Sequence, residues 1–446
     1  MSAPAIAPTA AVPALTAARR PRKLTVAERT LASGLRVLAV RRGSVPLVEV
    51  RLRVPFAGRS AGHTAKAAVL GETLLSGTAD LSTVDIAVAL QEIGGSLHVS
   101  ADPDRLLLSG NGLATGLPRL LAVLDDVLTG AAYPADEVVG ERDRLVQRLH
   151  MARSQPGVIA REALLRRIYG DHPYSREMAE VDAVAAVTPA QLRTLHRSRV
   201  IPAGSTLVIV GDVSPQRALD RVEAALSTWD GGAQAKRAPR VPPLQPGPVV
   251  LVDRPGAVQS NIRIGGRALP REDPHYAAMQ LANLVYGGYF SSRLVENIRE
   301  AKGYTYSPHS VIEHSTAGSS VVTEADVATA VTAPALLEMR YELGRIATVP
   351  VGERELGNAR QYAIGTLALS IATQAGLASM LTALLTSDVD VEWLREHTSR
   401  LGAVTVADVA EQAARFLAPR ALATVVVGDA SAVRPSLSTL DEVSTE

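Results

Sequence analysis

The chain has 446 residues, a formal net charge of +1 and no cysteine. The balanced charge gives no indication of nucleic acid or an anionic membrane surface as a partner, and the lack of cysteine excludes disulfides and thiol catalysis. A chain of this length exceeds what one hydrophobic core usually serves, so two or more domains are expected. No apolar run reaches membrane-spanning length, and a cytoplasmic protein is predicted.

The expected elements begin after an Ala- and Pro-rich lead, residues 1–23, which lacks a continuous apolar core and is predicted to be disordered. Residues 35–40 predict a first strand. Residues 48–54 alternate between apolar and charged types, which predicts a half-buried strand that pairs back onto the first. The capping sequence at 82–85 then predicts a helix over 86–93.

The second half of the chain repeats the order of the first. A helical segment opens at Val187 and leads to a strand that ends at Gly211, and a similar segment opens at Val404 and leads to a strand that ends at Gly428. The two starts and the two ends are each 217 positions apart. This periodicity predicts two copies of one fold.

The stretch between the copies, residues 229–248, is dense in Gly and Pro and predicts an exposed linker. The expected domains are therefore residues 24–228 and 249–440. Within each copy, strands are followed by helices instead of alternating with them, which predicts an α+β sandwich with an antiparallel or mixed sheet.

The most specific motif lies in the second copy, where Arg299 and Tyr306 stand seven positions apart across Gly303. The glycine predicts a helix stop, with Arg299 at the end of the helix, Tyr306 in a following strand, and both side chains facing one cleft. A forked cation and a phenolic donor suit a peptide carbonyl or a developing oxyanion. The local sequence by itself favours a simpler interpretation, in which Arg299 pairs with Glu296 or Glu300 and the tyrosine is a core residue with its hydroxyl in water.

The segment 291–307 resembles the arginine/tyrosine signature in the C-terminal half of the insulinase-like (pitrilysin) zinc peptidases. Other marks of that family occur in the same order, and the resemblance covers residues 24–429. They are Gly77-Thr78, Ile93-Gly94-Gly95, Gly287-Gly288 and the two Val-Gly-Asp strand endings. The resemblance implies two tandem homologous α/β sandwich domains that form a clamshell half of a peptidase chamber, which closes around an extended peptide.

Within that resemblance, Arg299 and Tyr306 are the expected catalytic residues. Tyr304, Gly288 and Ser291 are expected to bind the substrate, and Tyr304 is expected to shape the pocket without replacing Tyr306. Some bacterial and organellar members of the family divide the work between two chains, one with zinc and the other with the arginine and tyrosine. This chain resembles the second kind.

The zinc of these peptidases is held by an inverted H-x-x-E-H helix and a downstream glutamate. Counted back from Gly77-Thr78, the two histidine positions are Ala68 and Glu72. The general-base position is Gly71, and the downstream glutamate position is Arg148. Zinc needs neutral imidazoles or anionic oxygens, and a permanent cation repels it. No metal is therefore expected in this chain, and whether Glu72 pairs with Arg148 is left open.

A second histidine pattern, His309 to His314, reads H-x-x-x-E-H and is one residue longer than the inverted motif. Positions i and i+5 do not share a helical face, so these two imidazoles are poorly placed to grip one ion. The segment is interpreted as ordinary surface histidines on a strand and its turn.

Three functions remain open. The leading one is the non-catalytic, substrate-binding subunit of a heterodimeric zinc endopeptidase, inactive alone, whose paralogous H-x-x-E-H partner holds the zinc and whose substrate is a peptide. The alternative is a proteolytically inactive scaffold or peptide-binding core protein of the same fold. An independent hydrolase is disfavoured, because the sequence contains no G-x-S-x-G elbow.

Overall fold

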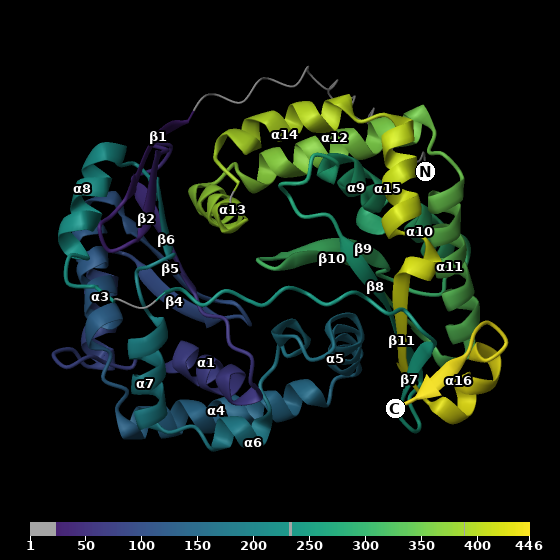
Figure 1. Cartoon of the computed structure of the whole chain (residues 1–446), viewed down its shortest axis with the longest axis horizontal. Helices are drawn as coiled ribbons and strands as arrows, with labels where there is room; N and C mark the ends of the chain where they lie inside the picture. The colour runs from purple at the N-terminus through teal and green to yellow at the C-terminus, as the bar shows by residue number, and fades with distance from the viewer. Residues whose placement is uncertain (1–23, 232–233, 388) are drawn as a thin grey trace, which may run out of the picture.

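The computed structural model describes residues 24–231, 234–387 and 389–446. The lead predicted to be disordered, residues 1–23, lies outside the described residues. Two six-stranded mixed sheets form the framework, one at the left and one at the right of Figure 1, with most helices on their outer faces. The predicted α+β class with two tandem domains is confirmed.

The first sheet has the strand order β1-β2-β6-β3-β5-β4. Its strands are β1 (Thr25–Thr30), β2 (Arg36–Arg41), β3 (Leu47–Pro55), β4 (Ser96–Ala101), β5 (Arg105–Leu113) and β6 (Thr206–Gly211). The expected pairing of the second strand with the first is wrong. β6 lies between them, parallel to β2 and antiparallel to β3. Alternation reports which face of a strand is buried and carries no information about the strand beside it.

β3 is also more buried than its alternating pattern predicts. Its charged residues face the second half of the molecule, and Glu49 is only 7% exposed. The burial of this carboxylate is offset by Arg51 on the same face, since their side chains form an ion pair of 2.8 Å. The charged residues of β3 therefore do not mark a solvent-exposed face of the strand.

The second sheet has the order β12-β7-β11-β8-β10-β9. Its strands are β7 (Val249–Asp253), β8 (Gln259–Ala268), β9 (His309–Ser315), β10 (Gly318–Ala328), β11 (Leu422–Gly428) and β12 (Val443–Thr445). Five strands repeat the order of the first sheet, and the pair β7/β11 is parallel like the pair β2/β6. The repeat predicted from the 217-residue offset is thus a repeat of sheet topology. β12 lies beyond residue 440, where the sequence places the end of the second domain, and it pairs with β7.

The helices of the two halves follow. The first half contains α1 (Ala61–Thr73), α2 (Thr83–Glu92), α3 (Leu117–Gly130), α4 (Ala135–Arg153), α5 (Pro156–Tyr169), α6 (Val181–Ala185), α7 (Pro189–Arg199) and α8 (Pro215–Ala225). The second half contains α9 (Tyr276–Asn283), α10 (Arg293–Val295), α11 (Thr332–Thr348), α12 (Glu353–Ser370), α13 (Gln374–Thr386), α14 (Glu392–Ala403), α15 (Val406–Phe416) and α16 (Ala430–Leu437). Two π-helical turns flank α10, η3 (Leu284–Gly288) and η4 (Glu296–Ala301). Single 3₁₀ turns occur at η1 (Ala114–Gly116), η2 (Pro173–Ser175), η5 (Thr329–Val331) and η6 (Pro419–Ala421).

Side-chain caps fix where several of these helices begin. Ser82 and Asp85 form the expected capping box, and α2 starts directly after Ser82, three residues before the predicted start. Thr188 and Thr405 cap α7 and α15 in the same way at equivalent places in the repeat. The two halves therefore share their helix signals as well as their strand order.

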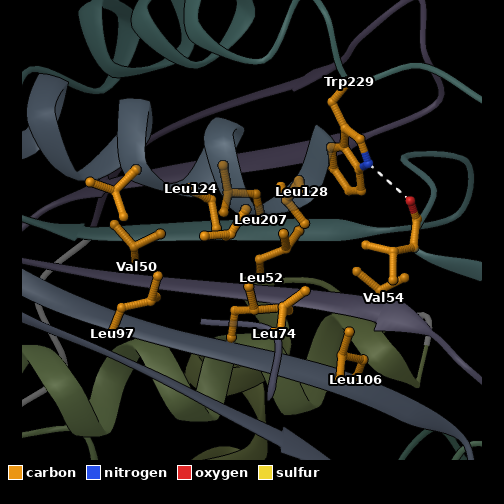
Figure 2. Packing of buried hydrophobic residues seen from close by; sticks show 14 of the residues in the cluster. Val50, Leu52, Val54, Leu74, Leu97, Leu106, Leu124, Leu128, Leu207 and Trp229 are labelled. Carbon is orange, nitrogen blue, oxygen red and sulfur yellow. Dashed lines mark hydrogen bonds between the residues drawn. The ribbon is translucent and has the colours of Figure 1, made fainter. Parts of the chain in front are cut away.

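The core of the first half lies between its sheet and α3 (Figure 2). Apolar side chains of β3, β5 and β6 meet Leu124 and Leu128 of α3. Trp229 lies at one end of this core and is 2% exposed. Its indole N–H donates to the carbonyl of Val200 at 3.1 Å. The first residue of the predicted exposed linker is therefore a core residue, and the described stretch beyond it contains no helix or strand before β7.

The two halves interlock through one helix each. α13 of the second half packs on β3 and β6 of the first sheet, and α5 of the first half packs on β8 and β11 of the second sheet. Both interfaces are apolar: Leu381 of α13 lies in a cluster with Val208 and Val210, and Leu164 of α5 lies in one with Val425. Each sheet is thus covered on its inner face by a helix from the other half.

Among the described residues, no single helix has both the length and the apolarity for a membrane crossing. Only α12 and α13 taken together reach these criteria, across a bend of 110°.

Candidate functional site

The arginine/tyrosine block is anchored to the second half by buried residues that precede Arg299. Arg293 is 6% exposed and donates to both carboxylate oxygens of Glu355 on α12, at 2.7 and 2.8 Å. Leu294 and Ile298 are fully buried in the second core. This bidentate ion pair and the apolar contacts fix the turn η4 on which Arg299 lies.

Gly303 ends this helical segment as expected, with φ at +63°. Its N–H donates to the carbonyl of Arg299 at 3.0 Å, and the N–H of Tyr304 donates to the carbonyl of Ile298 at 2.8 Å. The expectation that Tyr306 lies in a strand is wrong: it lies in the loop before β9. The strand begins only after Pro308, which has no N–H to give to a ladder.

The Arg299 guanidinium lies against two aromatic rings. Its central carbon is 5.1 Å from the ring centroid of Tyr306 and 4.7 Å from that of Phe290. Its Nε lies 3.4 Å from a carboxylate oxygen of Glu300. The structure therefore brings Arg299 and Tyr306 together, as the sequence predicts, and holds them by cation–π contacts.

The simpler interpretation from the local sequence is half right. The ion pair between Arg299 and Glu300 is present, but Tyr306 is 81% exposed and is no core residue. An aromatic ring that is this exposed gains little from burial, so packing does not explain its position.

The three residues expected to bind substrate have different surroundings. Tyr304 is partly buried against the second core, which suits a residue that shapes its neighbours' positions. Ser291 is exposed beside Phe290. A Cβ at Gly288 would approach Leu284 Cδ2 to 2.9 Å, so a larger residue there would require the Leu284 side chain to shift.

Phe290 is a residue that sequence reasoning missed. The chain has only three phenylalanines, and Phe290 is 64% exposed. The signal available in the sequence was a rare phenylalanine two residues after the glycine pair Gly287-Gly288. The structure adds that its large apolar side chain is kept in solvent. The central carbon of the Arg299 guanidinium lies over the Phe290 ring as well as over the Tyr306 ring.

The four positions aligned with the zinc site lie on two neighbouring helices. Ala68, Gly71 and Glu72 are on α1, and Arg148 is on α4. An Arg148 Nη lies 2.8 Å from a Glu72 carboxylate oxygen, with the two side chains 50% and 40% exposed. The pairing that the sequence left open is therefore present. Among residues 24–231, 234–387 and 389–446, no group of three or more His, Cys, Asp or Glu side chains is arranged to hold a metal ion.

The longer histidine pattern lies on β9, in agreement with its interpretation as a strand, but only His309 is an exposed histidine, and the expectation of a surface position is wrong for the partly buried His314. Residues 309 and 314 are an odd number apart and so point to opposite faces of the sheet. The Nε2 atom of His314 lies 3.1 Å from the hydroxyl of Tyr276, and its Nδ1 lies 2.8 Å from that of Ser319. Burial, followed by the nearby Arg271, lowers the pKa of His314 to about 3.

Comparison with known proteins shows which chains this one resembles. Residues 186–362 match the family described as "Peptidase M16 inactive domain". An uncharacterized zinc protease of Mycobacterium leprae is 26% identical over 301 residues, which span 66% of this chain and 67% of that protein. An uncharacterized zinc protease of Streptomyces coelicolor is 28% identical over 64% of each chain. A probable inactive metalloprotease of Bacillus subtilis is 26% identical over 44% of this chain and 46% of its own length. The segments aligned with the first two span about two thirds of those relatives.

Solved structures agree on the fold. A peptidase M16 inactive domain from Pseudomonas fluorescens superposes with a TM-score of 0.84 at 21% identity and covers 91% of this chain and 98% of its own. A protease from Helicobacter pylori gives 0.83 at 17% identity over 91% of this chain and all of its own. Together the sequence and structure matches support the resemblance to the insulinase-like peptidases inferred from the motifs.

Proposed function

We propose that this chain is the non-catalytic, substrate-binding subunit of a heterodimeric zinc endopeptidase and is inactive alone. It lends Arg299 and Tyr306 to an active site whose zinc lies on a paralogous subunit with an H-x-x-E-H helix. The observation that carries the proposal is the Arg299 guanidinium in cation–π contact with both Phe290 and the 81%-exposed ring of Tyr306. A phenol in this position is open to a second chain.

The chemistry of the pair fits an oxyanion. A cation–π contact uses no N–H donor, so the Nη donors of the guanidinium stay available, and the phenol adds one more donor. Donors that are fixed before the reaction stabilise the charge that develops on a peptide carbonyl without reorganising. The two rings and Glu300 supply this fixation.

The residues at the aligned metal site do not fit zinc. Ala68 and Gly71 offer no ligand atom, and the carboxylate of Glu72 is bound to the permanent cation of Arg148 at 2.8 Å. The zinc is for this reason assigned to the partner. The cytoplasmic location remains a prediction from the sequence.

The alternative function is a proteolytically inactive scaffold of the same fold. The family matched by residues 186–362 is described as an inactive domain, and one relative is described as a probable inactive metalloprotease. These descriptions support the coarser statement that the chain is an inactive domain of the M16 type, with or without a role in a partner's active site.

The test is to mix the chain with a zinc-bearing homologue encoded by the same genome. Tyr306→Phe should form a normal heterodimer in size-exclusion chromatography, yet cleave peptide with a kcat about 100- to 1000-fold lower, which is the usual cost of one oxyanion donor. Tyr304→Phe is the matched control and should change kcat much less. Arg299→Ala should also weaken peptide binding.

The outcomes separate the candidates. Full activity in both Tyr306→Phe and Arg299→Ala would reject the catalytic role and leave the scaffold function. Failure of every paralogue to associate with the wild-type chain would reject the heterodimer itself.

A further inference from the structure

A cavity of about 450 Å³ lies between the two halves of the molecule, away from Arg299 and Tyr306. The first sheet, the linker, the turn between β9 and β10, and the end of α13 all contribute to its wall. The charged residues that line it are Arg36, Arg53, Asp104, Lys236, Arg237 and Glu272. This volume falls in the range of small-molecule sites, roughly 300–1,000 Å³.

Arg53 is the unusual member of this wall. It is 6% exposed, and among the described residues it forms no hydrogen bond or ion pair. Its Nε is fully buried without a partner. Burial lowers the pKa of Arg53, while the charge of Asp104 opposes the shift. A guanidinium stays protonated in such surroundings. Arg53 is therefore a buried cation in the wall of the cavity that has no ion-pair partner among the described residues.

The acid whose charge opposes this pKa shift is hydrogen-bonded to other residues. Asp104 accepts hydrogen bonds from the hydroxyl of Tyr174 at 2.5 Å, and from the backbone N–H and the hydroxyl of Thr316 at 3.1 and 2.5 Å. All three bonds go to one carboxylate oxygen of this 7%-exposed residue. Asp104 thus ties the β9–β10 turn to the first half, and among the described residues no hydrogen bond joins it to Arg53.

The remaining charges make the cavity positive. Four cationic side chains and two carboxylates line it. Lys236 and Arg237 lie on the exposed linker, and Arg36 is bound by Glu28 through its Nε at 2.5 Å. An unpaired buried charge costs several kcal/mol of stability, and an anion that reaches Arg53 would offset that cost.

We propose that this cavity binds a small anion through Arg53, with Lys236 and Arg237 at its entrance. The ligand carries a phosphate or a carboxylate, because these are the planar or tetrahedral oxyanions that a guanidinium fork binds with two parallel hydrogen bonds. The proposal does not depend on the peptidase role, since neither Arg299 nor Tyr306 lines the cavity.

The test uses isothermal titration calorimetry on the full chain at physiological ionic strength. One arm titrates inorganic phosphate, and the other titrates acetylated trialanine with a free or an amidated C-terminus. We expect at least one anionic probe to bind and the amide to fail. Arg53→Met should weaken binding by at least about tenfold, whereas Arg105→Met, which removes a cation paired with Asp102 outside the cavity, should change Kd less than about twofold.

Two further measurements keep the proposal testable. Arg53→Met should leave the unliganded Tm unchanged or raise it, because it removes a charge that lacks a partner. If that variant does not fold, Lys236→Met combined with Arg237→Met alters only exposed linker positions and should also weaken the anion. The proposal is overturned if neither anion binds at millimolar concentration, or if binding survives in the Arg53 variant or in the linker double variant.

Discussion

At the scale of single residues, Glu72 and Arg148 show how the aligned zinc site has been replaced. Their ion pair is about half exposed on each side and contributes at most about 1 kcal/mol to stability. Its importance is geometric. The 2.8 Å contact shows that α1 and α4 bring positions 72 and 148 to one point, as a shared metal would require.

This geometry predicts that zinc binding can be restored. The variant Ala68→His, Gly71→Glu, Glu72→His and Arg148→Glu places two imidazoles at i and i+4 on α1 and a carboxylate on α4 within reach of one ion. A Cβ at Gly71 would meet Ala101 at an ordinary 3.5 Å, so a Cβ at this position needs no shift of its neighbours. After dialysis, metal analysis should find about one zinc per chain in the variant and none in the wild type.

The matched control is the same variant with Arg148 retained. It should bind zinc much more weakly, because the guanidinium repels the metal and competes for the ligands. An absence of zinc from the full variant would contradict the alignment of these positions, and stoichiometric zinc in the wild-type chain would contradict the proposed function.

Local spacing was enough to predict some of the candidate site. Gly303 ends the helix that carries Arg299, which brings Tyr306 back beside the guanidinium. The role of Phe290 and the isolation of Arg53 could not be predicted in this way. Phe290 lies between two π-helical turns, η3 and η4, and the cavity beside Arg53 is completed by residues from the other half of the chain, such as Thr316.

At the scale of elements, the exchanged helices α5 and α13 hold the two halves together. Each begins near the same place in its repeat and each covers the sheet of the other half. β2 and β6 are apolar on both faces because helices cover both faces of the sheet. Val40 and Val210 pack in the cluster with α13, while Val37 and Ile209 pack in the core with the helices of the first half.

We expect the α13 contact to be a major source of stability. Leu381→Ala removes a fully buried side chain from the cluster against β2 and β6, and such a cavity usually costs about 2–5 kcal/mol. Leu369→Ala on α12 is the control, because Leu369 is 77% exposed and its truncation should change stability by less than about 0.5 kcal/mol. Equal urea midpoints for the two variants would contradict a structural role for the exchanged helix.

The type of an element, helix or strand, could be predicted where the sequence signal was local. The pairing of strands within a sheet could not be predicted. The capping box at Ser82 predicted a helix at α2 because the cap lies within one turn of its partner. The neighbour of β3 is β6, whose strand lies about 150 positions further along the chain, and no short pattern in β3 specifies it. The strand endings at Gly211 and Gly428 predicted that the two halves are equivalent. They did not predict that β6 lies between β2 and β3, or that β11 lies between β7 and β8.

At the scale of the whole molecule, buried histidines link the helices of the second half to its sheet. Tyr276 on α9 lies between His314 of β9 and His397 of α14, and the latter stacks on Trp393 with ring centroids 4.0 Å apart. The Nε2 of His397 lies 2.8 Å from the amide oxygen of Gln280. Trp393 belongs to the cluster that also contains α13, so this aromatic stack connects to the interface between the halves.

This arrangement predicts that stability falls in mild acid. Burial, with a smaller contribution from Arg271, lowers the pKa of both His314 and His397 to about 3. An unfolded histidine has a pKa near 6.5, so the unfolded chain binds the proton more tightly and stability is lost as the pH falls below that value. At pH 5 the loss is about 2 kcal/mol per histidine. His63, His172 and His196 are shifted in the same direction by burial.

Urea denaturation at pH 7.5 and pH 5 tests this linkage. The urea midpoint of the wild-type chain should be lower at pH 5 than at pH 7.5. His397→Gln should make this difference smaller, because it removes one of the buried imidazoles. His98→Gln is the control, because His98 is exposed on β4 and its loss should leave the decline unchanged. If the wild-type midpoint is the same at both pH values, or if His397→Gln declines as steeply as wild type, these imidazoles are not kept neutral by the fold.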